Sequence, residues 1–123
     1  MKHKIVFNDC YGGYALSDKA IDWLSEHGSE RTRKFIAKKR AEANEKIKDY
    51  TSRVCVTADS TRKFYVMDAV RSFLERHDPD LVAVVEVLGK EASGSFSDLV
   101  IEEIDGDEYY IDEYDGKETI VTT

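Results

Sequence analysis

One short stretch near the start of the chain, residues 8–14 (NDCYGGY), gathers two glycines, two tyrosines, a carboxylate and a thiol. Glycines let a ligand approach the backbone closely, and tyrosine rings can stack on a flat base. Ser17 follows and can cap a helix, whose first backbone amides suit an anion. A tight turn with tyrosines packed on a sheet is the alternative. The candidate ligand-binding residues here are Asn8, Asp9, Tyr11, Gly12, Gly13, Tyr14 and Ser17.

A second cluster, Arg76-His77-Asp78-Pro79, places a guanidinium, an imidazole and a carboxylate before a helix. The planar guanidinium of Arg76 can pair with a phosphate or carboxylate, and His77 can donate or stack. Helix capping alone explains Asp78. We select Arg76 and His77 as binding candidates and expect Arg76 to be exposed and replaceable without loss of stability; the alternative for both is a plain surface role.

The third cluster is an acidic hairpin, residues 109–116, in which aromatic and acidic side chains are interspersed. Asp112, Glu113 and Asp115 could accept hydrogen bonds from ribose hydroxyls, bind a cation or form an acid-base pair. A glycosidase-like pair needs a defined separation and a raised pKa on one member, and the sequence defines neither. The alternative is the solvated outer face of a hairpin.

Nucleophilic catalysis has little support in this sequence. Cys10 would need a histidine base, and His77 is the only plausible partner among three histidines. Cys10 and Cys55 also lack the spacing of a zinc site or of a disulfide framework. We therefore predict a protein with no catalytic residues, metal or cofactor. A small hydrolase using His77 as acid or base is the minority alternative.

Hydrophobic periodicity and turn signals predict the elements that position these residues. In order, they are a strand at 4–7, a helix from Ser17 to Gly28, a longer helix from Ser29 or Glu30 toward Tyr50, a strand at 53–57, a turn at 58–63, and a helix from Pro79 to Gly89 or Gly94. Residues 64–75 fit either a helix or a strand.

The C-terminal part reads as an antiparallel meander of strands at 99–104, 108–114 and 117–122, with turns at 105–107 and 115–116. Asp-Gly between strand-like runs is a strong hairpin signal because both turn positions need positive φ. With helices covering one face of this sheet, we predict a single α+β domain over residues 1–123.

Charge is distributed unevenly along the chain, which has a net charge of −7. Residues 31–40 carry six bases and no acid, whereas residues 98–123 carry ten acids and one base. The basic run fits a solvated helix face or a phosphate-facing surface, and the acidic segment could attract the basic run of a second copy. We expect a homodimer or larger assembly and no general nucleic-acid binding.

No apolar run approaches the roughly 18 residues that cross a bilayer, and no signal peptide is evident. The expectation is a cytoplasmic protein that makes no membrane contact.

Two parts of the chain resemble a group of small phage and prophage proteins. Residues 5–14 (IVFNDCYGGY), with Leu16-Ser17, are similar to the group's NDCYGGF motif, although Tyr14 replaces the phenylalanine. The second match comprises the short pieces 76–79 (RHDP), 81–82 (LV), 84–86 (VVE), 88–89 (LG), 92–94 (ASG) and 111–116 (IDEYDG). Together the matches cover about half of the chain, and residues 31–73 do not match.

The resemblance implies a phage origin, and small phage proteins of this kind include sponges that sequester the nucleotide messengers of Thoeris and CBASS immunity. By this analogy we expect the chain to hold a cyclic ADP-ribose isomer or cyclic oligonucleotide in the host cytoplasm without cleaving it. The alternative is an inhibitor that binds a bacterial protein through its acidic surface.

In the sponge hypothesis each cluster has a part in holding the nucleotide. Tyr11 and Tyr14 would stack a base, and the amides of the two glycines with Arg76 would hold the pyrophosphate. The acids of the hairpin, Asp112, Glu113 or Asp115, would accept the ribose hydroxyls. This hypothesis requires the N-terminal motif and Arg76 to lie side by side.

Overall fold

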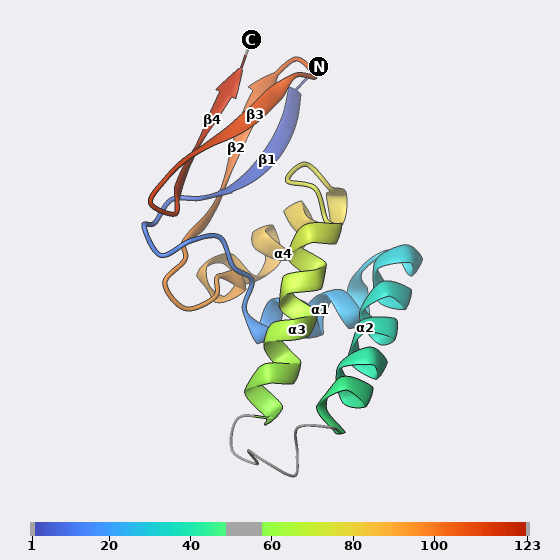
Figure 1. Ribbon diagram of the computed structural model, residues 1–123. Coiled ribbons are helices and arrows are strands. Elements are labelled where there is room, and N and C mark those ends of the chain that lie inside the picture. Colours follow the sequence, from blue (N-terminus) through green and yellow to red (C-terminus); the bar gives the residue numbers. More distant parts are fainter. Residues whose placement is uncertain (1, 49–57, 123) are drawn as a thin grey trace.

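The structure is a computed structural model that describes residues 2–48 and 58–122 and has the predicted α+β fold. Its elements are β1 (Lys2–Asn8), α1 (Asp18–His27), α2 (Glu30–Lys48), α3 (Ala58–Phe73), α4 (Pro79–Leu88), the 3₁₀ turn η1 (Gly89–Ala92), β2 (Leu99–Asp105), β3 (Tyr109–Tyr114) and β4 (Lys117–Thr122). The strands gather at one end of the molecule, where the chain also begins and ends (Figure 1).

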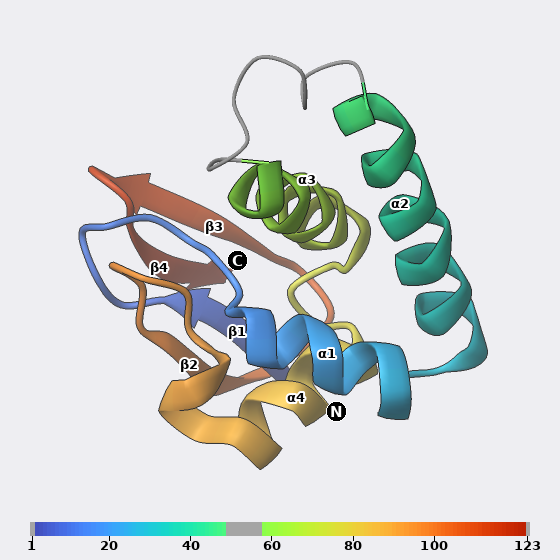
Figure 2. The same cartoon turned by 90° about the horizontal axis from the view of Figure 1, so that it is seen from below.

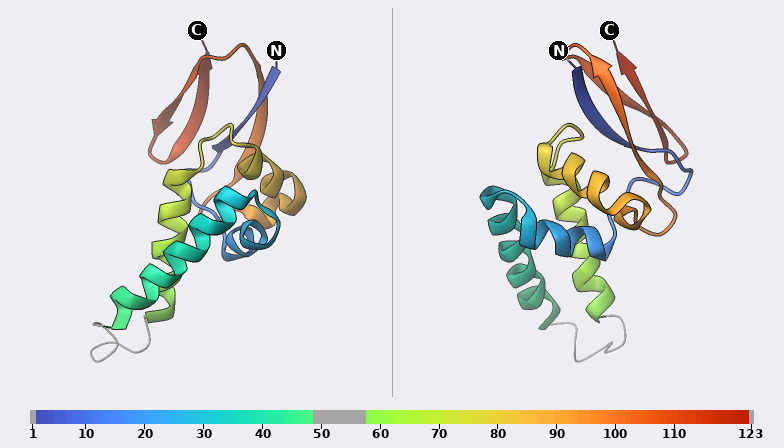
Figure 3. Two further views of the ribbon diagram at one scale, coloured as in Figure 1. Left: turned by 90° about the vertical axis from the view of Figure 1, so that its right-hand side faces the viewer. Right: turned by 180° about the vertical axis from the view of Figure 1, so that it is seen from behind.

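The strands form two antiparallel pairs, β1 with β2 and β3 with β4. The predicted meander is therefore wrong in its pairing, because β2 takes β1 as its partner rather than β3. Ile5 and Val6 are both fully buried, and neighbouring residues in a strand point to opposite faces. Val6 packs with the helices, while Ile5 lines a small cavity with Tyr109. Strand β1 is thus covered on both faces, whereas a single sheet with helices on one side would leave one of its faces uncovered. Figure 3 shows the two strand pairs next to each other at one end of the molecule.

Helices α1 and α4 begin and end where the sequence predicts. The Ser17 hydroxyl accepts a hydrogen bond from the amide of Ala20, and Asp78 accepts one from the amide of Asp80 ahead of α4. Gly89 ends α4 with a φ of +59°, a conformation that favours glycine. These boundaries were predictable because each depends on residues within one turn of the helix end.

Helix α3 corrects two expectations for the middle of the chain. Residues 58–63, predicted as a turn, belong to this helix, and the ambiguous segment 64–75 is helical as far as Phe73. Val66, Val70 and Leu74 recur at helical spacing and are buried. Their burial outweighs the polar character of the first turns. The predicted strand at 53–57 lies outside the described residues.

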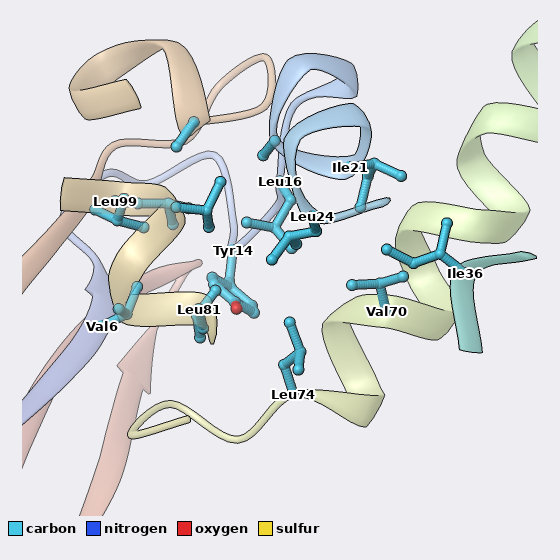
Figure 4. Close-up of a cluster of buried hydrophobic side chains, with 14 of the residues drawn as sticks. Val6, Tyr14, Leu16, Ile21, Leu24, Ile36, Val70, Leu74, Leu81 and Leu99 are labelled. Atoms are coloured by element: carbon cyan, nitrogen blue, oxygen red, sulfur yellow. The ribbon is translucent and has the colours of Figure 1, made fainter. Parts of the chain in front are cut away.

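The core joins all four helices to β1 and β2. Helix α1 contacts α2, α3 and α4 in the middle of the helical part (Figure 2). Figure 4 shows Tyr14 among the aliphatic side chains of this core, including Leu24, Leu74 and Leu81. None of the described helices is long and apolar enough to cross a membrane.

Candidate functional site

The three clusters singled out in the sequence meet at one place. A cavity of about 410 Å³, here called the hairpin cavity, lies beside the β3–β4 turn. The residues that line it are Gly13, Tyr14, Arg71, Ser72, Arg76, Glu113, Gly116 and Glu118. The N-terminal motif, Arg76 and the acidic hairpin therefore lie side by side, as the ligand hypothesis requires.

Asn8 holds these segments together and is fully buried. Its Nδ2 donates to the carbonyls of Cys10 and Gly116 at 2.8 and 2.9 Å, and its Oδ1 accepts from the amide of Asp98 at 2.8 Å. Its own backbone amide donates to Oε1 of Glu118 at 2.8 Å. With its polar atoms engaged in this way, Asn8 positions the loop, the hairpin and β2 and is not free to contact a ligand.

The glycines of the motif serve close packing. A Cβ on Gly116 would lie 2.5 Å from the carbonyl oxygen of Tyr11 and 2.6 Å from the nitrogen of Gly13. A Cβ on Gly12 would collide with Phe96. Asp115 and Gly116 have φ angles of 51° and 90°, as expected for an Asp-Gly hairpin turn. Glycine at position 116 therefore lets the hairpin turn meet the N-terminal loop, and glycine at position 12 lets that loop meet the segment at Phe96.

Arg76 is a structural residue, contrary to the expectation of an exposed ligand clamp. Its Nη1 and Nη2 donate to Oε1 and Oε2 of Glu118 at 2.5 and 2.8 Å, and its guanidinium lies 3.6 Å from the centre of the Tyr14 ring. Burial lowers the pKa of Arg76, but the hydrogen bonds to Glu118 and the nearby Tyr14 outweigh this, so the pKa is raised. The Glu118 carboxylate therefore makes the bidentate contact with Arg76 that a ligand was expected to make.

The reason for this pairing lies in the hairpin register. Glu118, only 5% exposed, stands directly opposite Glu113 across the β3–β4 pair. Like charges directly opposite each other are destabilising, and a buried carboxylate without a counter-charge is costly. Arg76 neutralises the buried member of the pair and leaves Glu113 at the cavity.

Tyr14 and Tyr11 have different environments. Tyr14 is 7% exposed, and its burial raises the pKa of the phenol to about 12. One face of its ring carries the Arg76 guanidinium, so Tyr14 cannot stack a base as predicted. Tyr11 is 59% exposed, with the Lys117 ammonium 5.4 Å from its ring centre. Of the two tyrosines, only Tyr11 presents a ring to solvent.

Arg71 and Ser72 are cavity residues that sequence reasoning missed. Nη1 of Arg71 donates to the carbonyl of Tyr14 at 2.9 Å, and Nη2 pairs with Asp68. Ser72 is exposed at the cavity. Both lie near the end of α3, the segment whose helical character was ambiguous. A helix predicted there would have placed Arg71 in the last helical turn before Arg76, and so would have indicated that the two arginines lie close together.

The remaining candidates lie outside the hairpin cavity. Ser17 caps α1 and donates to the carbonyl of Glu91, and Asp9 lies 3.6 Å from the Lys117 ammonium. Asp112 and Asp115 are exposed on the hairpin. These positions therefore have structural or solvent-facing environments.

His77 occupies a neighbouring depression between two polar groups. Its Nε2 lies 2.9 Å from Oε2 of Glu75, and its Nδ1 lies 2.7 Å from the hydroxyl of Tyr109. This carboxylate–imidazole–hydroxyl order could activate a nucleophile. However, burial and the nearby Glu75 charge raise the pKa of Tyr109, which disfavours the tyrosinate that an attack would need.

The hairpin also presents an outer face. Because side chains alternate along a strand, Tyr110, Asp112 and Tyr114 point to one side of β3, and Tyr109, Ile111 and Glu113 point to the other. Tyr110 and Tyr114 are 56% and 78% exposed. Two exposed aromatic rings on either side of a carboxylate form a surface that differs from an ordinary solvated strand.

Comparison with protein-family models, curated proteins and solved structures found no match to this chain. Among residues 2–48 and 58–122, no group of three or more histidine, cysteine, aspartate or glutamate side chains is arranged to hold a metal ion.

Proposed function

We propose that this chain is a phage anti-defence protein that binds a nucleotide-derived immune signal of its bacterial host and sequesters it without cleavage. The convergence of the three motif segments on the hairpin cavity carries this proposal. A volume of about 410 Å³ is within the range of small-molecule sites, about 300–1,000 Å³.

The contacts assigned to the ligand follow from which groups remain available at the cavity. Arg71 has N–H groups beyond those bound to Tyr14 and Asp68, and the Ser72 hydroxyl is exposed, so these two would donate to a phosphate. Glu113 would accept from a ribose hydroxyl. Tyr11, whose backbone lies beside Gly116, would stack a base at the rim. The Arg76–Glu118 pair forms the wall of the site.

A thermal-shift panel of cyclic ADP-ribose isomers, cyclic dinucleotides and cyclic mononucleotides tests this proposal. A ligand present at a hundred times its Kd should stabilise the protein by about 2.7 kcal/mol. Arg71→Gln should weaken binding about tenfold, the range for hydrogen bonds to charged groups, and Ser72→Ala should weaken it less. Lys38→Gln is the matched control, because it also removes one positive charge but lies at an exposed position outside the cavity.

Recovery of an intact nucleotide after heating separates holding from hydrolysis, whereas a fragmented product would indicate the hydrolase alternative. Failure of the whole panel to shift the melting temperature would contradict the proposal. Light scattering tests the accompanying expectation of a homodimer or larger assembly, and a mass of one chain would contradict it.

A second candidate function, inhibition of a bacterial protein, is favoured by the outer face of the hairpin. Tyrosine is enriched in protein interfaces, and exposed acids steer a basic partner. Affinity capture from host lysate should recover a partner that is released at high salt. Asp112→Asn with Tyr114→Ser should abolish this capture and leave the fold intact, because both side chains are exposed. Capture unchanged by these substitutions would exclude this face.

A further inference from the structure

A second cavity, here called the three-helix cavity, is lined by residues of α1, α2 and α3. Figure 1 shows that these helices lie away from the end of the molecule that holds the strands. Its volume is about 300 Å³, and it shares no lining residue with the hairpin cavity. Ile21, Ala43 and Val66 are buried and give it an apolar lining. The polar residues around them are Asp18, Asp22, Arg40, Asn44, Arg62 and Lys63. The cavity is therefore apolar within and charged at its border.

Arg62 differs from the other cations of this cavity. Nη2 of Arg40 pairs with Oδ1 of Asp22 at 2.7 Å, and Nζ of Lys63 lies 3.6 Å from Oδ2 of Asp18. Nε of Arg62 is buried and has no hydrogen-bond partner within the described part of the chain. Most buried donors in proteins are satisfied, and the Arg62 side chain lines the cavity, so its guanidinium is the group that an acceptor in the cavity would meet.

The charge around the cavity specifies the acceptor further. Three cationic and two anionic side chains line it, which leaves an excess of one positive charge, and Arg62 carries it. A single negative charge on the ligand would balance the charge of Arg62, because Asp22 and Asp18 are already balanced by Arg40 and Lys63. A polyanion such as a nucleic-acid backbone would be repelled by those two carboxylates. A neutral ligand would leave Arg62 without a counter-charge.

We propose that the three-helix cavity binds a small organic monoanion, whose carboxylate or phosphodiester group pairs with Arg62 and whose apolar body packs on Ile21, Ala43 and Val66. Arg40 and Lys63 add long-range attraction while they remain paired with their aspartates. Asn44, exposed at the border, can orient the anion through its side-chain amide. This site is independent of the hairpin cavity and of the nucleotide proposed for it.

Benzoate and benzamide provide a matched pair of probes, because they share the ring and differ in charge. Titration of the full chain with each, followed by NMR of the arginine Nε–Hε signals, should show binding of benzoate with a shift of the Arg62 signal. Benzamide should bind about tenfold more weakly or not at all, as expected when a charged hydrogen bond is lost. Methyl phenyl phosphate, tested in parallel, distinguishes a phosphodiester from a carboxylate preference.

Three substitutions localise the binding. Arg62→Gln should weaken benzoate binding about tenfold or more, and Asn44→Asp should also weaken it because it adds a negative charge at the border. Lys38→Gln, exposed on the same helix as Asn44 but outside the cavity, should leave it unchanged. Equal binding of the two probes, benzoate binding unaffected by Arg62→Gln, or no binding of either monoanion would each overturn the proposal.

Discussion

The two cavities of this molecule use arginine in opposite ways. At the hairpin cavity, Arg76 makes a bidentate pair with Glu118 and packs on Tyr14, so its charge is neutralised within the fold. At the three-helix cavity, the buried Nε of Arg62 has no hydrogen-bond partner within the described residues. The first arginine lies in a conspicuous motif and the second in a stretch without one. A conspicuous motif can therefore contain residues that the fold itself requires, while an arginine outside any motif can be the better candidate for binding a ligand.

The largest expected effect that tests this comparison is on Arg76. Arg76→Ala should lower the free energy of unfolding by about 3–5 kcal/mol, because it leaves Glu118 buried without a counter-charge. Urea unfolding of the wild type and the variant measures this difference. A loss below about 1 kcal/mol, typical of a surface substitution, would remove the contrast between the two arginines.

A double variant gives the control for this result. Arg76→Ala with Glu118→Gln removes both charges, so it should be more stable than Arg76→Ala alone. If the double variant loses as much as the two single changes together, the pair does not act as a unit.

The next largest effect is expected at Asn8. Asn8→Ala should cost about 2–3 kcal/mol, because it leaves the carbonyls of Cys10 and Gly116 and the amide of Asp98 without their partner. Differential scanning calorimetry measures the loss. Asn8→Asp keeps the acceptor for Asp98 but loses both donors, so a variant as stable as the wild type would show that those donors contribute nothing.

A smaller effect is expected on how stability depends on acid pH, through the contact between the starts of α2 and α4. Asp80 accepts hydrogen bonds from the hydroxyls of Ser29 and Thr32 at 2.6 and 2.5 Å. Burial raises the pKa of this carboxyl, but these hydrogen bonds outweigh burial and the pKa is lowered. The folded pKa is then below the unfolded one, so the stabilisation is complete above the unfolded pKa, about 3.9, and is lost as the pH falls through the folded pKa.

Asp80→Asn provides the corresponding comparison. At pH 7 the variant should lose about 1–2 kcal/mol of unfolding free energy, the contribution of hydrogen bonds to a charged group. Unfolding curves at pH 7 and at pH 3 should show that the gap between wild type and variant narrows in acid. A gap that stays constant would mean that Asp80 acts through its shape and not through its charge.

The smallest expected effect is at Arg62. Arg62→Gln should change the free energy of unfolding by no more than about 0.5 kcal/mol, because within residues 2–48 and 58–122 the Nε of Arg62 has no hydrogen-bond partner to leave behind. The same urea series that measures Arg76→Ala measures this change. A large loss of unfolding free energy would place Arg62 with Arg76 among the structural arginines and would remove the contrast between them.

The sequence predicted those features that depend on neighbouring residues. Ser17 and Asp78 mark the starts of two helices, and the turn at 115–116 has the positive φ angles that Asp-Gly implies. The pairing of β1 with β2 was not predictable in this way, because Lys2 stands opposite Asp105 and no local signal joins them. The start of α3 was hidden for a similar reason, since its stability comes from buried contacts with other helices.

The candidate site shows the same division. Gly13, Tyr14, Arg76 and Glu113 were predicted and do line one cavity. Their roles were not predictable, because the sequence does not say whether an arginine already has a carboxylate partner. Glu118 was passed over as one acid among many, although its burial decides the role of Arg76.

The bonds of Asn8 also have a consequence for how the chain is made. They join residues 108 and 110 positions apart, so the first strand leaves the ribosome long before the hairpin that fixes its end. At about 5–20 residues per second, this interval is roughly 5–20 s. During it, the apolar residues Ile5, Val6 and Phe7 have neither β2 nor the hairpin to cover them. Exposed apolar surface of this kind is prone to aggregation, so the interval is the stage of synthesis at which the chain is most vulnerable. A premature stop before Gly116 would leave β1 without the hairpin bonds that fix its end.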